Sequence, residues 1–329
     1  MKSLKAFFKT VVALIFPAAA TEQNVGIIIE YPEMCDPSAA VAITGTLFIV
    51  ASDEDNLLRV YMRETSAPPQ RFDLNSFLRP DEDFPEADIE GGTRIGDHIF
   101  WIASHGRNQL GKLRPSRHRL FATKVAVDGN RVTVSPVGLP YTKLVEDLAQ
   151  APALRKYDLE SASRKAPEAE GGLNIEGLVS TPKGTLMIGF RNPIPGGKAL
   201  IVPLDNPQQT IEGEQARLGS PIELALNGLG IRSMEYRENQ GRYLIVAGPY
   251  NDDGKVALFS WSGKRSEAAE LMPEGRFGDL NPEAMFVYPG DPTAVQFLSD
   301  DGGRKLNGKS CKQMARAEQR FRGFSLDIR

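Results

Sequence analysis

A short pattern recurs along the chain: a glutamate stands just before a strand-like apolar run, with a small polar residue two positions earlier. The copies ADIEGGTR, LNIEGLVS, RSMEYREN and NPEAMFVY carry Glu90, Glu176, Glu235 and Glu283, and a weaker copy, DPSAAVAI, carries Ser38 instead. We call these five residues the anchors. In four copies a turn and a second apolar run follow, ending 14 residues after the anchor, and in the fifth the distance is 16. The chain therefore repeats a unit of strand, tight turn and strand.

The spacing of the anchors predicts the fold class. Successive anchors are 52, 86, 59 and 48 residues apart. Units of about fifty residues that hold several short strands are typical of β-propellers. We predict an all-β fold, a single β-propeller of five blades over residues 21–329. The 86-residue interval is expected to hold a helical insertion around residues 141–165, and a degenerate sixth blade in that interval is the alternative.

The two ends of the chain are expected to share one blade. The last unit offers AMFVYP, AVQFLS and RGFSLDI, which make three strands. NVGIIIEY, from Asn24 to Tyr31, supplies a fourth strand from the opposite end. Such sharing removes an unpaired strand edge. Cys35 and Cys311, the two cysteines of the chain, lie on either side of this junction, and we predict that they form a disulfide.

Composition and the first residues limit the setting of the protein. Residues 1–20 combine three lysines, a short apolar run and Ala18-Ala19-Ala20, as in a cleavable signal peptide. We therefore expect a periplasmic or secreted protein, most simply a monomer. The apolar run is too short to cross a bilayer, so an integral membrane protein is not expected. The formal net charge of −3 argues against nucleic acid as a partner.

The anchors predict a cluster of acidic groups on the propeller axis. The first strand of each blade lines the central channel, so residues at its start converge there. Carboxylates that meet in a buried place repel one another unless something neutralises them. A calcium ion bound by Ser38, Glu90, Glu176, Glu235 and Glu283 is one solution, because calcium takes six to eight oxygen ligands. Hydrogen bonds from the backbone of the next blade, which would make each anchor a structural clip, are the other.

The loops after the second strands return to the same face as the anchors. They carry the candidate ligand-binding residues Arg107, Asn108, Arg191, Asn192 and Tyr250. Guanidinium groups match phosphate and carboxylate oxygens, so an anionic small molecule is the expected ligand. Neutralisation of the glutamates by the two arginines is the alternative. His105 is the candidate catalytic residue, since it is the histidine nearest to the expected channel mouth.

Several segments resemble a known family. DIEGGTRIGDHIFWIASHGRN, RPSRHRLFAT, NIEGLVSTPKGTLMIGFRNP and SDDGGRKLNGKSCK are similar to the bacterial family DUF3616, over most of residues 35–329. That family has no assigned activity, so the resemblance implies a fold. The order of the anchors also resembles the calcium site of calcium-dependent apyrases and of esterase-like, phytase-type propellers, which implies that the five anchors are metal ligands.

The function expected from these features is that of an exported calcium-dependent hydrolase. Its substrate would be an anionic small molecule of the phosphate ester or lactone type. The alternative is a non-catalytic propeller that binds a ligand or another protein and uses the glutamates as structural clips. The sequence leaves open whether the protein is an enzyme.

Overall fold

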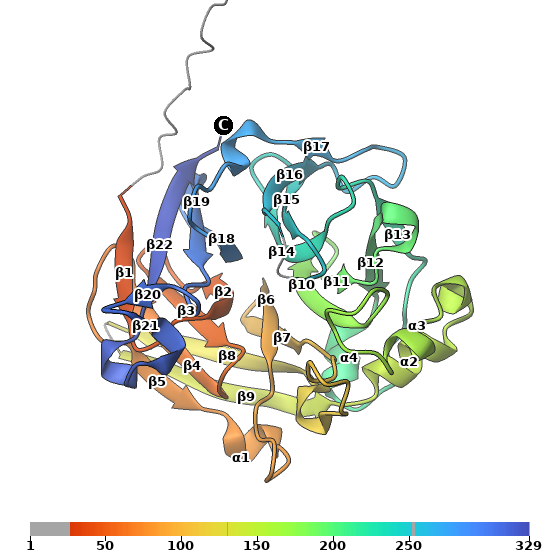
Figure 1. The fold of residues 1–329 in the computed structure, drawn as a ribbon, viewed down its shortest axis with the longest axis horizontal. Coiled ribbons are helices and arrows are strands. Elements are labelled where there is room, and N and C mark those ends of the chain that lie inside the picture. Colours follow the sequence, from red (N-terminus) through yellow and green to blue (C-terminus); the bar gives the residue numbers. More distant parts are fainter. Residues whose placement is uncertain (1–26, 130, 252–253, 329) are drawn as a thin grey trace, which may run out of the picture.

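A computed structural model describes residues 27–129, 131–251 and 254–328 of the chain. These residues form five four-stranded antiparallel sheets arranged around one axis, together with a small two-stranded sheet (Figure 1). The arrangement confirms the predicted five-bladed β-propeller. The alternative of a sixth blade is not found within the described residues. The predicted signal peptide, residues 1–20, lies outside them.

Each of the first four blades is built from four consecutive strands. Blade 1 contains β2 (Pro37–Ala42), β3 (Leu47–Ser52), β4 (Leu57–Met62) and β5 (Gln70–Asp73). Blade 2 contains β6 (Ile89–Ile95), β7 (His98–Ala103), β8 (Leu120–Asp128) and β9 (Arg131–Tyr141). Blade 3 contains β10 (Asn174–Ser180), β11 (Leu186–Asn192), β12 (Ala199–Leu204) and β13 (Ile222–Leu224). Blade 4 contains β14 (Gly230–Arg237), β15 (Arg242–Gly248), β16 (Ala257–Trp261) and β17 (Glu270–Leu271).

Blade 5 combines the two ends of the chain. It contains β18 (Pro282–Tyr288), β19 (Asp291–Ser299), β22 (Arg320–Asp327) and, as the outer strand, β1 (Ile29–Pro32). The pairing of β1 with β22 runs from Ile29 opposite Gly323 to Pro32 opposite Arg320. The outer edge of β22 is thus covered by a strand from the other end of the chain, as a closed ring requires.

The first strands of the five blades surround the axis (Figure 1). Their packing explains the Glu-Gly pairs of the sequence. A Cβ atom on Gly91 would lie 2.9 Å from the Cβ of Leu178, and one on Gly177 would lie 2.7 Å from the Ile231 side chain. Neighbouring blades approach so closely at these points that the residue after the glutamate has room for glycine alone.

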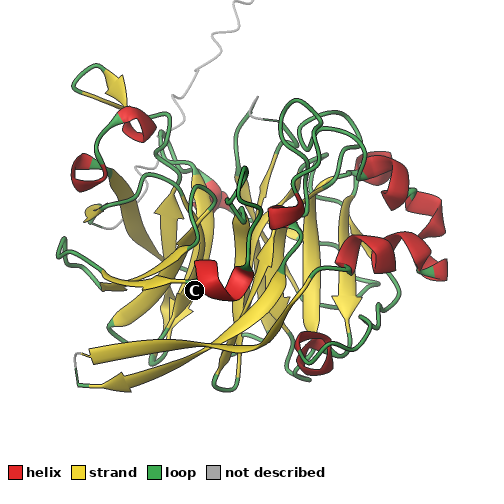
Figure 2. Ribbon diagram, turned by 90° about the horizontal axis from the view of Figure 1, so that it is seen from below, coloured by secondary structure: helices red, strands yellow, loops and turns green. Residues whose placement is uncertain are grey.

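The core lies between neighbouring blades, where apolar side chains from facing sheets pack together. β3 is buried along its whole length, and the largest cluster lies between blades 2 and 3. The helices lie outside the sheets (Figure 2). They are α1 (Asn75–Leu78), α2 (Leu144–Gln150), α3 (Leu159–Ala162) and α4 (Pro207–Ile211). Residues 141–165 carry α2, α3 and a 3-10 turn, and Leu144, Leu148 and Leu159 cover the cluster between blades 2 and 3. The described part of the chain holds no helix that is long and apolar enough to cross a membrane.

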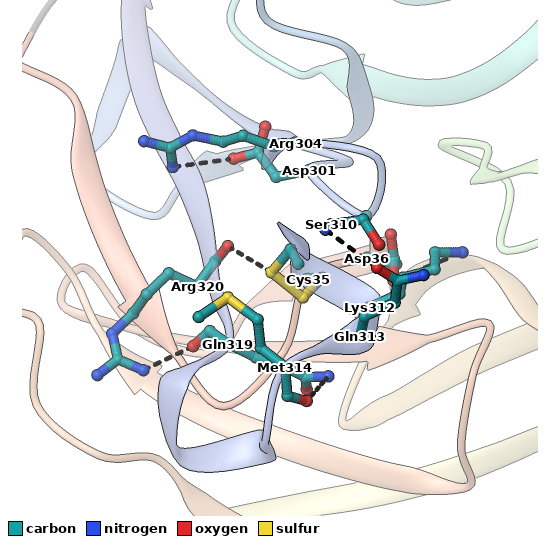
Figure 3. Close-up of a disulfide and its surroundings, with 12 residues drawn as sticks. Cys35, Asp36, Asp301, Arg304, Ser310, Lys312, Gln313, Met314, Gln319 and Arg320 are labelled. Carbon is teal, nitrogen blue, oxygen red and sulfur yellow. Dashed lines mark hydrogen bonds and ion pairs between the residues drawn. A yellow bond between two sulfur atoms is a disulfide. The ribbon is translucent and has the colours of Figure 1, made fainter. Parts of the chain in front are cut away.

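A loop between β19 and β22 is fastened to the start of blade 1. It carries the hairpin of β20 (Lys305–Leu306) and β21 (Lys309–Ser310), followed by 3-10 turns. Cys311 in this loop is disulfide-bonded to Cys35, which confirms the predicted pair (Figure 3). The Asp301 amide also donates a hydrogen bond of 2.9 Å to the Cys35 carbonyl. The loop therefore lies at the junction where the propeller ring closes.

Candidate functional site

The first strand of every blade contains a β-bulge at the same place, and in four of the five blades the bulged residue lines one common cavity. In blade 3, Ile175 pairs with Phe190 and Gly177 with Gly189, so that Glu176 is skipped by the ladder. The same break in register occurs in the other four blades. The five equivalent residues are Ser38, Glu90, Glu176, Arg232 and Glu283. A β-bulge turns one side chain out of the alternating order in which a strand presents its side chains to the two faces of the sheet. Bulges at equivalent places can therefore bring one side chain from each blade to a common site.

Arg232 takes the ring position that the sequence pattern assigns to Glu235. Glu235 lies three residues further along β14, paired with Leu244. It lines a separate cavity of about 420 Å³ with Thr93, Ser180 and other residues near the far ends of neighbouring first strands. Its carboxylate accepts a hydrogen bond of 3.2 Å from the Val287 amide of blade 5. Glu235 is thus a clip between blades and not a member of the ring.

The sequence pattern selects Glu235 because it is a glutamate with a small polar residue, Ser233, two positions earlier, and because its distance from the end of the next strand agrees with the other copies. The residues that pair just before the bulge are 14 to 17 positions apart in the five blades. In blade 4 they are Ile231 and Ala247. A fixed distance of 14 residues, counted back from Pro249, therefore selects Glu235 instead of Arg232.

The ring opens into a cavity of about 510 Å³. Its described lining includes nine carboxylates and four basic groups. The acids are Asp53, Glu54, Glu86, Asp88, Glu90, Glu168, Glu176, Glu283 and Asp300, and the basic residues are Arg117, Arg191, Arg232 and Lys312. We call this space the acidic cavity. Because acids outnumber bases, its electrostatic potential favours a positively charged occupant.

On the side of blades 3 to 5, arginines neutralise the ring. Arg191 Nη1 lies 2.8 Å from Glu176 Oε1. Arg232 lies between the two neighbouring glutamates, with Nη1 2.5 Å from Glu283 Oε1 and Nε 3.8 Å from Glu176 Oε2. Burial raises the pKa of Glu283 to about 8 even though Arg232 opposes the shift. This half of the ring is a chain of ion pairs that connects three blades.

On the side of blades 1 and 2, the ring lacks such partners. The Ser38 hydroxyl donates a hydrogen bond to the Ile89 carbonyl of blade 2. The Glu90 carboxylate makes no hydrogen bond or ion pair with any residue that the structure describes. Burial, and then the neighbouring Glu176 and Asp88, raise the pKa of Glu90 well above its usual range. Burial likewise raises the pKa of Asp53 well above its usual range. A cation at this place would relieve the repulsion.

The predicted ligand-binding residues do not converge. Arg107 points away from the acidic cavity, since its Nε donates to the Ser163 carbonyl over 2.8 Å and its Nη1 to the Gly111 carbonyl over 3.1 Å. Asn108 lines the cavity, but its Oδ1 accepts hydrogen bonds from two amides of its own loop. Arg191 lines it as the partner of Glu176. The alternative in which arginine neutralises the glutamates therefore describes Arg191.

Asn192 and Tyr250 lie beside a different cavity, of about 430 Å³, near α3. The Asn192 amide donates hydrogen bonds of 2.7 Å to the Pro167 and Ala169 carbonyls. Asn192 is 1% exposed, so it fixes the preceding loop against blade 3 and does not offer a free donor.

His105 is buried and does not line the acidic cavity. Its Nδ1 lies 2.8 Å from the Ala103 carbonyl, and its ring stacks on His118 at a centroid distance of 5.7 Å. Burial, and then His118, lower the pKa of His105 to about 3. The imidazole is therefore neutral and shielded, which does not suit a base that acts at the channel mouth.

Several cavity residues were not identified as site residues from the sequence. Asp53, Asp300 and Lys312 come from loops that return to the ring face, and Asp88 comes from just before β6. The signal was the run of acids after two second strands, Asp53-Glu54-Asp55 and Asp300-Asp301. The position of Lys312 at the cavity could not be predicted from the residues around it in the sequence, because it depends on the neighbouring disulfide between Cys35 and Cys311.

Comparisons with known proteins identify relatives by sequence and by fold. The family model described as "Protein of unknown function (DUF3616)" matches residues 37–141 and 137–283. No curated protein matches. Among solved structures, a streptogramin B lyase is similar over 91% of this chain and 97% of its own, at 9% identity and a TM-score of 0.39. A putative oxidoreductase (glucose dehydrogenase) from Thermus thermophilus is similar over 91% and 99%, at 12% identity and a TM-score of 0.42. A GH43 glycoside hydrolase is similar over 90% and 51%, at 12% identity and a TM-score of 0.44. By the extent of the family match, which covers most of the propeller, the chain belongs to the DUF3616 family.

Proposed function

We propose that the acidic cavity binds a calcium ion at Glu90, and that the protein acts through this ion on an anionic small molecule. The observation that carries the proposal is the Glu90 side chain, which has no partner among the described residues and lies in a cavity lined mainly by carboxylates. Glu176 lies on the neighbouring ring position and Glu283 on the far side of Ser38. Each has a second carboxylate oxygen that can join Glu90, although Glu176 Oε2 also lies 3.8 Å from Arg232 Nε. The Ser38 hydroxyl oxygen, which donates to Ile89, has free lone pairs that can complete the set.

The residue types that line the acidic cavity suit a hard cation. Calcium is bound by carboxylate, hydroxyl and carbonyl oxygens in irregular geometry, and the described cavity lining offers no histidine or cysteine. The volume of about 510 Å³ is far larger than one ion needs. The remaining space suits a small molecule that is held partly by the ion and partly by polar rim residues such as Asn108 and Gln109.

A hydrolase of the phosphate ester or lactone type is the catalytic form of this proposal. A bound calcium ion supplies positive charge that polarises a phosphoryl or carbonyl oxygen. The chain itself would position the substrate at the rim, while the ion pairs of Arg191 and Arg232 hold the ring in shape. Hydrolysis of a panel of phosphate esters and lactones, measured with calcium and with chelator, tests turnover directly.

Calcium binding is tested by isothermal titration of the purified protein and of the variant Glu90→Gln. We expect the variant to bind calcium at least about tenfold more weakly, because it loses one charged ligand of the ion. Glu235→Gln is the matched control: it changes a half-buried glutamate of a first strand that lies outside the ring and lines a separate cavity, and it should leave calcium affinity unchanged. Equal calcium affinity in wild type and Glu90→Gln would contradict the proposal.

A non-catalytic propeller is the second candidate, and the ion pairs of blades 3 to 5 favour it. Glu176, Arg232 and Glu283 join three blades without any ligand. In this alternative, chelator leaves the melting temperature unchanged and no substrate of the panel is hydrolysed. In the calcium proposal, removal of the ion lowers the melting temperature, since an ion bound to the native state stabilises it by mass action.

We also propose that the protein is periplasmic or secreted. The disulfide between Cys35 and Cys311 supports this location, because such bonds persist in oxidising compartments. Mass spectrometry of exported protein that begins at Thr21 would agree with cleavage after residue 20, and a cytoplasmic full-length chain would contradict it.

A further inference from the structure

A second group of carboxylates lies beside the disulfide, at the edge of the acidic cavity. Asp36, Asp53 and Glu54 each place one oxygen within 4.8 Å of the others. We call these three residues the blade 1 triad. Asp36 follows Cys35 directly, and the other two follow the end of β3. Oxygens that bind one calcium ion at about 2.3–2.6 Å lie up to about 5 Å apart, so the spread of the triad fits a single ion.

Lys312 is the basic side chain that contacts the triad. Its Nζ lies 2.7 Å from Glu54 Oε1 and 3.6 Å from Asp36 Oδ2. Asp300 adds a further carboxylate beside Asp36. Arg316, from the same loop, is paired with Asp55 over 3.1 Å and not with the triad. One ammonium group thus faces several carboxylates, and the triad keeps an excess of negative charge.

Asp36 is the buried member of the triad, and the Asp300 side chain lies within hydrogen-bond reach of it. Asp36 is 3% exposed, and its Oδ1 has no hydrogen-bond partner among the described residues. A buried carboxylate oxygen without a partner is costly unless an ion or a proton satisfies it. The residue beside it is Gly302, where a Cβ would lie 2.0 Å from Asp36 Oδ1 and 2.3 Å from Lys312 Cε. The absence of a side chain at Gly302 leaves room for both charged groups.

The disulfide fixes the lysine and the acid relative to each other. Cys35 precedes Asp36 and Cys311 precedes Lys312, so the bond brings the two charged residues together although they are far apart in sequence (Figure 3). The Lys312 amide also donates a hydrogen bond of 3.3 Å to the Gly302 carbonyl. The Lys312 side chain is 44% exposed, so its ammonium group is able to swing into solvent.

We propose that Asp36, Asp53 and Glu54 form a second divalent-cation site, and that Lys312 is its resident counter-ion, which an incoming ion displaces. Asp53, Glu54 and Lys312 line the acidic cavity as Glu90 does, but Asp36 does not: with Glu54 it lines a second cavity of about 220 Å³ next to the disulfide, which Glu90 does not reach. The site therefore differs from the one proposed at Glu90. Lys312 would set the ion affinity of the triad, because a tethered ammonium competes with a free cation for the same oxygens.

Isothermal titration with calcium alone tests the proposal. Lys312→Met keeps the length of the side chain and removes its charge, and we expect the triad of this variant to bind calcium at least about tenfold more tightly than wild type. Lys309→Met is the matched control, since Lys309 lies in the same loop, is exposed and is not part of the triad. The calcium affinity of Lys309→Met should equal that of wild type.

Asp36→Asn in the Lys312→Met background should abolish this tightened binding. Glu54→Gln in the same background should weaken calcium binding. Because it changes a half-exposed side chain and leaves the buried groups intact, it replaces Asp36→Asn as the test if that variant does not fold. Equal calcium affinity in wild type and Lys312→Met, or tight binding retained in both acid variants, would overturn the proposal. Glu90→Gln distinguishes the two sites: it removes one ion and leaves the binding that responds to Lys312→Met.

Discussion

At the scale of the residue, two half-buried glutamates on first strands, Glu90 and Glu235, have different tasks because only Glu90 lies at a β-bulge. Glu90 lies at a bulge and faces the acidic cavity without a partner among the described residues. Glu235 lies in the regular part of β14 and accepts a hydrogen bond from blade 5. Bulges decide which side chains reach an axis, and a pattern of residue types does not reveal them.

Glu235 should make the stability of the protein depend on pH. Burial raises the pKa of Glu235 to about 8. Between the unfolded pKa of about 4.5 and this value, the native state holds a proton that the unfolded state has lost, so stability falls as pH rises through this interval. We expect Glu235→Gln to flatten the profile and to be more stable than wild type above pH 8, by about 2 kcal/mol.

Urea denaturation between pH 5 and pH 9 measures this effect. The exposed Glu238, which lines the same cavity, gives the control Glu238→Gln, and its profile should follow wild type. An unchanged slope in Glu235→Gln would show that this carboxylate is ionised in the native state across the range.

At the scale of the element, the bulge of β14 connects three blades through one side chain. Arg232 is 5% exposed and pairs with Glu176 on β10 and with Glu283 on β18. Each first strand contacts its neighbours at the axis, so these ion pairs act where the blades meet. Loss of one partner of a buried ion pair is far more costly than the pair itself is stabilising, because the other charge is left without compensation.

We therefore expect Arg232→Met to destabilise the propeller by about 3–5 kcal/mol, measured by chemical denaturation. The double variant Arg232→Met with Glu283→Gln should recover part of this loss, since it removes one of the uncompensated carboxylates. Arg242→Met is a suitable control, because Arg242 pairs with the exposed Glu270 and should change stability by less than about 1 kcal/mol. If Arg232→Met cost no more than this control, the ion pairs would not be what holds the three blades together.

At the scale of the whole molecule, the closure of the ring depends on two contacts of different kinds. β1 has four residues, and the disulfide lies three residues after it. Cys35 and Cys311 are separated by 276 positions, so the bond restricts the unfolded chain over most of its length. The loop-entropy model gives about 5 kcal/mol for such a large loop.

Replacement of both cysteines by alanine should therefore lower the free energy of unfolding by up to about 5 kcal/mol. Denaturation of the wild type with and without a thiol reductant is the internal control, since the reduced protein should resemble the double variant. A loss below about 1 kcal/mol would mean that β1 and its neighbours close the ring without help from the bond.

The fold class could be predicted from the amino-acid sequence, because a propeller depends on local features. Apolar runs that are separated by tight turns specify β-hairpins, and here they recur about every fifty residues. The apolar face of one such unit can be buried only against the next unit of the same kind. Four of the five anchors, Ser38, Glu90, Glu176 and Glu283, stand at the equivalent bulge of their blades, and two of them are followed by a glycine, Gly91 or Gly177, where neighbouring blades approach closely. The cysteine pair could be predicted because both residues flank the closure of the ring.

The tertiary structure alone decided which of these groups share a cavity. Arg232 replaced Glu235 because the hairpins differ in length, and no local pattern records the register of a bulge. Arg107 and Asn192 resembled ligand-binding residues but bond to backbone carbonyls of their surroundings. Lys312 reaches the blade 1 triad through a bond that spans the chain. Which charges meet depends on contacts between residues far apart in sequence, and such contacts form only when the ring closes.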